Sequence, residues 1–159
     1  MNILVLGIGN MLLSDEGAGN KAVEDLQQRF HFPPEVEVVD GGTMGLDLLP
    51  YLDDRTHLFI IDAVKSGNAP GTMVRLELDN PPAYFRTKIS PHQLGLSEVL
   101  AVATLTDNLP PKIVLFGIEP KDLSTGLGMS PEVAENIGRL AEMIVDELTS
   151  LGLKVEDVG

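Results

Sequence analysis

Short apolar runs alternate along this chain with stretches whose apolar residues recur at helical spacing. Uninterrupted apolar runs are typical of parallel strands that are buried on both faces. Strands are predicted on this basis at residues 3–8, 36–40, 57–64 and 112–117. Residues 72–78 instead alternate between polar and apolar side chains, which predicts a strand with one exposed face. We expect that strand at an edge of the sheet, not necessarily parallel to the others.

Helical spacing and proline positions predict the intervening elements. Helices are expected at residues 17–30, 46–52 and 93–105, and a long helix is expected to run from Pro131 to about Leu151 with Ser130 as its N-cap. Residues 80–91 are polar and contain prolines, so a loop is predicted there, and residues 119–131 form a glycine-rich connection. This alternation predicts an α/β fold with a single domain over residues 1–159. Its sheet is expected to be open, twisted and mostly parallel, with about five strands and helices on both faces.

Composition narrows the classes of function. The chain has 159 residues, 24 Asp and Glu against 11 Lys and Arg, a formal net charge of −13, and no cysteine. Without clustered basic residues no nucleic-acid partner is expected, and no apolar stretch approaches the length that spans a membrane. The absence of cysteine excludes disulfides, thiolate catalysis and Cys-type zinc sites. We expect a cytoplasmic protein without a signal peptide, and nothing demands more than a monomer.

The first predicted strand ends in a glycine-rich turn, Gly7-Ile8-Gly9-Asn10, and the adjacent acids Asp15 and Glu16 follow where a helix should begin. Helix N-termini attract anions through free backbone N–H groups. Acids at that point can cap the helix, repel a phosphate or hold a cation. The turn has two glycines of a dinucleotide-binding fingerprint, but Leu12 replaces the third, and the acids oppose a pyrophosphate. Dinucleotide binding is therefore disfavoured.

Polar residues stand at the carboxyl ends of the predicted strands, where open α/β sheets form their ligand crevice. These residues are Asn10, Glu16, Asp40, Asp62 and Glu119. Asp62 is the most informative, because burying a carboxylate costs several kcal/mol unless it is paired or coordinates a metal. Each of these acids also has a possible structural role that involves no ligand. Asp15 and Glu16 serve equally well as helix caps, Asp62 as a hydrogen-bonded residue at a strand end, and Asp40, which precedes two glycines, as a turn-forming acid.

Of the three histidines, only His92 is placed to reach such a crevice, because it lies at a proline turn just before a predicted helix. A lone histidine is more often structural. If Glu16, Asp62 and His92 meet, however, they form an oxygen and nitrogen site that suits a divalent transition metal. Softer ligands would have to come from another molecule, since this chain has no thiol.

An ordered set of motifs resembles the [NiFe]-hydrogenase maturation endopeptidases, in particular those of the hydrogenase-2 type. The resemblance covers nearly the whole chain, and the ordered set is specific although the opening glycines alone are not. The motifs are Leu6-Gly-Ile-Gly-Asn10, Asp15-Glu16-Gly17, Asp40-Gly-Gly-Thr43, Asp62-Ala63, Ser90-Pro-His-Gln-Leu-Gly95 and Gly117-Ile-Glu-Pro120.

The resemblance implies a cytoplasmic endopeptidase, of the aspartyl type, that removes a C-terminal extension from the hydrogenase large-subunit precursor after nickel insertion. It implies that Glu16, Asp62 and His92 contact the nickel carried by the precursor, whose cysteine thiolates supply the soft ligands. No organic cofactor is expected. Asp40 is our candidate for a supporting role or for the general base. The alternative is a module that binds the nickel centre as a chaperone and cuts nothing.

Overall fold

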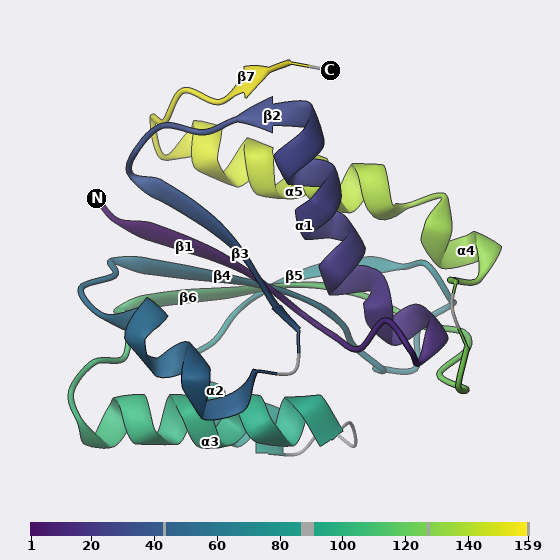
Figure 1. Ribbon diagram of the computed structural model, residues 1–159, viewed down its shortest axis with the longest axis horizontal. Helices are drawn as coiled ribbons and strands as arrows, with labels where there is room; N and C mark the ends of the chain where they lie inside the picture. The colour runs from purple at the N-terminus through teal and green to yellow at the C-terminus, as the bar shows by residue number, and fades with distance from the viewer. Residues whose placement is uncertain (43, 87–90, 127, 159) are drawn as a thin grey trace.

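Five strands form a central sheet in the order β3–β1–β4–β6–β5 (Figure 1). The structure, a computed structural model, describes residues 1–42, 44–86, 91–126 and 128–158. The strands of this sheet are β1 (Ile3–Ile8), β3 (Val36–Gly42), β4 (His57–Ala63), β5 (Met73–Glu77) and β6 (Lys112–Ile118). All neighbours pair in parallel except β5, which lies antiparallel to β6 at the edge. The predicted fold class is therefore confirmed, as is the predicted edge strand.

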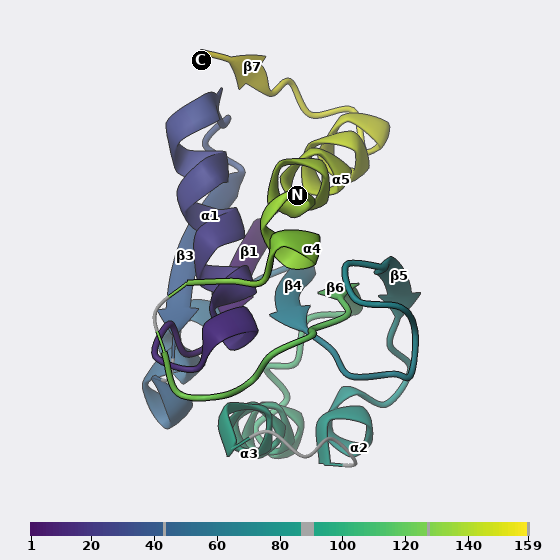
Figure 2. The same cartoon turned by 90° about the vertical axis from the view of Figure 1, so that its right-hand side faces the viewer.

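Helices cover both faces of this sheet (Figures 1 and 2). On one face lie α1 (Ala18–Arg29), α4 (Pro131–Ala134) and α5 (Ile137–Ser150), and on the other lie the 3-10 helix η2 (Gly45–Leu52), α2 (Pro81–Arg86) and α3 (Pro91–Leu105). Strand residues divide between the faces by alternation: Phe59 and Ile61 pack in the core under α1 and α5, and Leu58 and Ile60 in the core over η2 and α3. No helix within the described ranges is long and apolar enough to cross a membrane.

The segment expected to be a loop at residues 80–91 contains the short helix α2, so that prediction was wrong there. Pro81 and Pro82 occupy the first turn of α2, where the missing N–H groups would have no intrahelical partner in any case. Phe85 of this helix is fully buried against the sheet side of α3. Residues 87–90 lie outside the described part of the chain.

The long C-terminal helix is also interrupted, between α4 and α5, which the sequence did not predict. Asn136 has φ −105° and ψ −1°, and its side-chain amide donates to the carbonyl oxygens of Gly71 and Glu132, at 3.2 and 3.1 Å. A side chain that bonds a backbone carbonyl in this way competes with the helical hydrogen-bond ladder. One partner, Glu132, lies four residues earlier, but the other, Gly71, comes from a loop 65 residues earlier, which the helical pattern of this segment does not indicate.

Further differences are small. The first helix begins with a separate 3-10 turn, η1 (Ser14–Gly17), and Pro50 lies inside η2, which is 3-10 and not α-helical. Phe30, expected at the end of the first helix, instead starts the two-residue strand β2 (Phe30–His31). This strand pairs antiparallel with β7 (Glu156–Asp157), which forms a second small sheet next to α1 and α5.

The strand order turns at β1, because the chain first adds β3 on one side and then crosses to add β4 on the other. Such a switch point opens a crevice outside the carboxyl ends of the two strands, here β1 and β4. Two glycines let α1 lie close over this point. A Cβ at Gly19 would stand 2.2 Å from the carbonyl oxygen of Ile8 and 2.4 Å from that of Ile61, and one at Gly7 would stand 2.5 Å from the carbonyl oxygen of Gly19.

Gly19→Ala should therefore lower the free energy of unfolding by about 3 kcal/mol, because a methyl group would force α1 away from β1 and β4. Urea unfolding would measure the change. Gly138→Ala is a matched control in α5, since a Cβ there would meet only the Arg29 Nη1 atom, at 3.4 Å. The control should leave stability unchanged or raise it by up to about 1 kcal/mol. Equal losses in both variants would contradict the close approach at Gly19.

Candidate functional site

Four acidic residues stand in a row along the carboxyl edge of the sheet, one for each parallel strand. In the order of the strands they are Asp40 in β3, Glu16 after β1, Asp62 in β4 and Glu119 after β6. Asp40 is exposed, whereas Glu16, Asp62 and Glu119 are 5%, 0% and 5% exposed. The sequence thus placed these acids at one edge, and the structure adds that three of them are buried.

Glu16 belongs to η1, which contacts β4 at the switch point. Its backbone N–H donates to the carbonyl oxygen of Leu13, and its own carbonyl oxygen accepts from the N–H of Asn10, at 3.1 and 3.2 Å. A Cβ at Gly9 would lie 2.0 Å from this same Glu16 carbonyl oxygen. The glycines of the opening turn therefore allow η1 and α1 to pack against β1, and they do not form a phosphate cradle.

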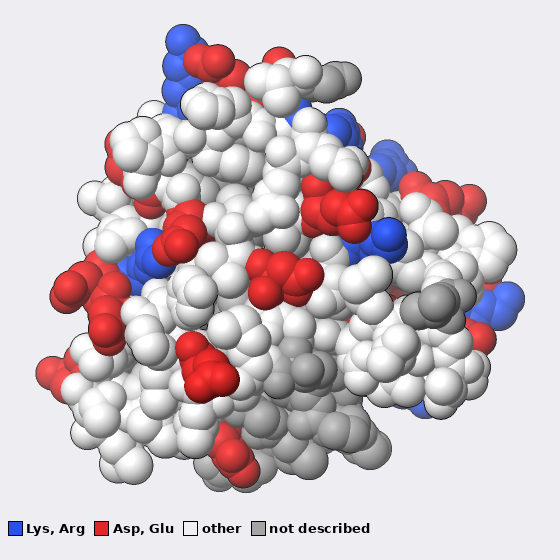
Figure 3. All heavy atoms as spheres, in the orientation of Figure 1, with Lys and Arg blue, Asp and Glu red and all other residues white. Residues whose placement is uncertain are grey.

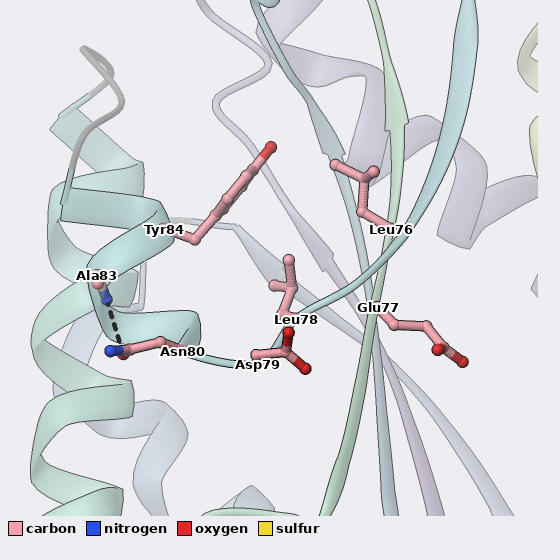
Figure 4. A pocket seen from close by; sticks show the side chains of 7 residues that line it. All are labelled: Leu76, Glu77, Leu78, Asp79, Asn80, Ala83 and Tyr84. Carbon is pink, nitrogen blue, oxygen red and sulfur yellow. Dashed lines mark hydrogen bonds between the residues drawn. The ribbon is translucent and has the colours of Figure 1, made fainter.

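Asp62 is fully buried and follows Ile60 and Leu58 on the face covered by α2 and α3. Its negative charge acts on the hydroxyl group of Tyr84 in α2. Burial raises the pKa of the half-buried Tyr84 hydroxyl, and the negative charge of Asp62 raises it further. Tyr84 also lines a groove of about 440 Å³ between α2 and β5 and extends from α2 into it (Figure 4). Sequence reasoning missed Tyr84, because it treated its segment as a loop.

Asp40 has the turn role that its position before two glycines suggested. Its Oδ1 atom accepts from the backbone N–H of Gly42, at 3.0 Å, and from the side-chain amide of Asn20 in α1, at 2.8 Å. The contact with Asn20 places Asp40 on the α1 face of the sheet, opposite to the face of Asp62. The structure therefore brings Asp40 to the same edge as Asp62, but on the other side of the sheet.

Asp15 does not cap the first helix, which was one of the readings left open. Gly17 is the N-cap residue of α1 and no side chain caps it. Instead, the fully buried Asp15 carboxylate accepts four hydrogen bonds of 2.7–2.8 Å, from the N–H groups of Lys121, Asp122 and Ser130 and from the Ser130 hydroxyl. Burial alone would raise the pKa of Asp15, but these hydrogen bonds outweigh it and lower the pKa below its usual range.

The carboxylate of Glu119 is likewise hydrogen-bonded within the protein. Its Oε1 atom accepts from the N–H and hydroxyl of Ser66 and from the N–H of Asn68, at 2.8–3.1 Å. Both partners lie in the connection between β4 and β5, so this carboxylate fastens that connection to the end of β6. We therefore assign Glu119 to the support of the edge.

His92, the third member of the predicted set, lies in the first turn of α3, but its side chain is outside the described part of the structure. Thr43, from the motif that begins at Asp40, is also outside it. Among the side chains that are described, no three of His, Asp or Glu are grouped closely enough to hold a metal ion. Figure 3 shows one face of the molecule, on which acidic groups are more numerous than basic ones and no basic patch is visible. The acids at the edge favour a cationic ligand over an anionic one.

Fold and edge together define a class: an α/β protein that carries buried carboxylates at the switch point between β1 and β4, and whose opening glycines form no phosphate cradle. Comparison with known proteins identifies the family to which the chain belongs. Residues 20–147 match the sequence profile of the hydrogenase maturation protease family, HycI. Over 155 residues the chain is 45% identical to the hydrogenase 2 maturation protease of Escherichia coli strain K12, covering 97% of this chain and 94% of that protein. It is 40% identical to the hydrogenase expression/formation protein HupD of Rhodobacter capsulatus, covering 96% and 74%.

Solved structures agree. The hydrogenase maturating endopeptidase HybD from E. coli superposes with a TM-score of 0.94 at 43% identity, over 99% of this chain and 98% of that one. The [NiFe] hydrogenase maturation protease HybD from Thermococcus kodakarensis gives 0.76 at 27% identity, over 92% and 99%. The chain therefore belongs to the hydrogenase maturation protease family, and it is a peptidase.

The effect of Asp62 on Tyr84 can be tested directly. Asp62→Asn should lower the pKa of Tyr84, because a neutral amide removes the negative charge that disfavours the tyrosinate. Spectroscopic titration in a Tyr51→Phe background would report Tyr84 alone, since the chain has two tyrosines. Asp40→Asn in the same background is the control and should leave the titration unchanged. An unchanged Tyr84 titration in Asp62→Asn would show that the two groups are not neighbours.

Proposed function

We propose that this protein removes the C-terminal extension of a [NiFe]-hydrogenase large-subunit precursor, and that it acts after nickel has been inserted. The peptidase family and the similarity to the hydrogenase 2 maturation protease of E. coli support the reaction. The observation that carries the nickel dependence is the pair of buried carboxylates, Glu16 and Asp62, at the switch point between β1 and β4. Buried carboxylates are stabilised by a cation, and here the cation is cargo of the substrate.

In this proposal Glu16, Asp62 and His92 contact the nickel centre of the docked precursor and align the scissile bond beside it. The nickel polarises the scissile carbonyl, or a nearby carboxylate activates the attacking water. The three proposed contacts are oxygen and nitrogen donors, and the chain contains no cysteine that could add a thiolate. The thiolates that complete the coordination therefore come from the precursor.

The first experiment is the intact mass of a nickel-loaded precursor before and after incubation with this protein, beside a nickel-free control. Loss of a C-terminal peptide from the nickel-loaded sample alone is the expected result. A stable complex without a mass change would overturn the cleavage reaction in favour of a chaperone that binds the nickel centre. Cleavage of both samples would overturn the nickel dependence.

The proposed nickel contacts make a prediction of their own. Glu16→Gln and His92→Ala should each reduce processing roughly 100-fold or more, because each removes a group that holds the reacting centre in place. Circular dichroism and thermal unfolding would establish that each variant is folded. Gln28→Glu is a control that changes the charge of an exposed side chain of α1 away from the carboxyl edge, and it should process normally. Normal processing by a folded His92→Ala protein would exclude His92 from the site.

Asp40 lies at the same edge of the sheet as Asp62 but on the α1 face, and it remains our candidate for a supporting role or for the general base. Asp40→Asn should keep the turn intact, because the asparagine carbonyl oxygen can still accept from Gly42 and Asn20, but it removes the basic carboxylate. Loss of a general base lowers the rate roughly 100-fold. The rate of cleavage under saturating precursor would measure this. Full activity in Asp40→Asn would leave Asp40 with its turn role only.

A further inference from the structure

The segment that follows β6 is hydrogen-bonded to the turn that carries Glu16; its described residues are 121–126 and 128–130, called segment 121–130 below. The Asp15 carboxylate accepts the four bonds described above from Lys121, Asp122 and Ser130, and the Asp15 N–H donates to the carbonyl oxygen of Asp122 at 2.9 Å. Gly126 lies beside Leu13, and its N–H donates to the carbonyl oxygen of Leu12 at 2.8 Å. Two parts of the chain more than 100 residues apart therefore form one unit.

This attachment holds η1 in an unfavourable backbone conformation. Ser14, the first residue of η1, has φ 51°, in the left-handed region that a residue with a side chain rarely adopts. Its hydroxyl donates to the carbonyl oxygen of Ser124 at 2.8 Å, and its N–H donates to that of Gly126 at 3.1 Å. Strained backbone of this kind persists where the surroundings fix it, and it is concentrated at functional sites.

Asp15 and Glu16 are the next two residues of η1 after Ser14. Successive residues of a 3-10 helix point about 120° apart, so the carboxylates of Asp15 and Glu16 leave η1 in different directions. Asp15 reaches segment 121–130, while η1 contacts β4, the strand of Asp62. The backbone bonds of Glu16 are short-range, to Leu13 and Asn10. Its place relative to Asp62 thus depends on the conformation of the whole turn.

We propose that Asp15 is a positioning residue: by binding segment 121–130 it fixes η1 and so aims the Glu16 carboxylate at the nickel of the docked precursor. This inference rests on the proposed function. A carboxylate suits the role because it only accepts hydrogen bonds, and all four groups that face it are donors. Asparagine has the same shape, but its amide NH₂ would oppose donors that now bind a carboxylate oxygen.

The test is a double-mutant cycle on nickel discrimination, the ratio of the dissociation constants for nickel-free and nickel-loaded precursor. The four proteins are the wild type, Asp15→Asn, Glu16→Gln and the double variant. Asp15→Asn should lower the ratio roughly tenfold, an effect within the range of coupled neighbours. In the Glu16→Gln background the same substitution should change nothing further, because Asp15 acts through Glu16.

A purely structural role for Asp15 predicts a different result, since loss of stability lowers the folded fraction for both precursors and leaves their ratio unchanged. An unchanged ratio in Asp15→Asn, or equal losses with and without Glu16, would overturn the proposal. Ser130→Ala is the milder variant should Asp15→Asn fold poorly. It removes one of the four donors and should lower the ratio by a smaller factor that again vanishes in Glu16→Gln.

Glu132→Gln is the matched control. It removes the 2.7 Å ion pair that joins Lys121 of the same segment to α4 but none of the hydrogen bonds of Asp15, and it should leave the ratio at its wild-type value. If the wild-type protein itself bound both precursors equally, the proposed nickel recognition would fail and the positioning role with it. Wild-type discrimination combined with an additive cycle would overturn the positioning role alone.

Discussion

The close contact between α1 and the sheet is the constraint on which the rest of this molecule depends. Gly19 brings the backbone of α1 onto the carbonyl oxygens of Ile8 and Ile61, at the ends of two adjacent strands. With α1 held there, the turn before it has to fold back across the carboxyl edge of β1. That path places η1 against β4 and leaves Glu16 at the switch point.

The same contact explains why a glycine-rich turn before a helix does not make this a nucleotide-binding protein. In a phosphate cradle, glycines leave room for the ligand beside the helix N-terminus. Here the room beside Gly7 and Gly9 is filled by the protein's own backbone, the carbonyl oxygens of Gly19 and Glu16. The N-terminal end of α1 is preceded by buried acids, which disfavour an anion at that place.

Much of this architecture could be predicted from sequence, because its strands are locally encoded. Apolar runs such as Ile3–Ile8 mark buried parallel strands, and the alternation through Met73–Glu77 marks the antiparallel edge. The positions of Glu16 and Asp62 at the carboxyl edge follow from the same pattern. Apart from the short helix α2, what escaped prediction depends on distant partners. At the helix break, Asn136 donates to the carbonyl oxygen of Gly71, and the environment of Asp15 is built from groups 106 to 115 residues away. A local reading could offer helix capping only.

The donor chemistry of the edge gives the proposed reaction its order. The proposed contacts Glu16, Asp62 and His92 are oxygen and nitrogen donors, and this chain has no thiol to add to them. In the proposed reaction the nickel is not taken up as a free ion, because a precursor that already holds nickel would bring thiolate donors with it. A precursor without nickel would bring a neutral or anionic site to this edge, and such a site does not stabilise buried carboxylates. Cleavage gated by nickel then needs no separate sensor, because the metal is shared between substrate and enzyme.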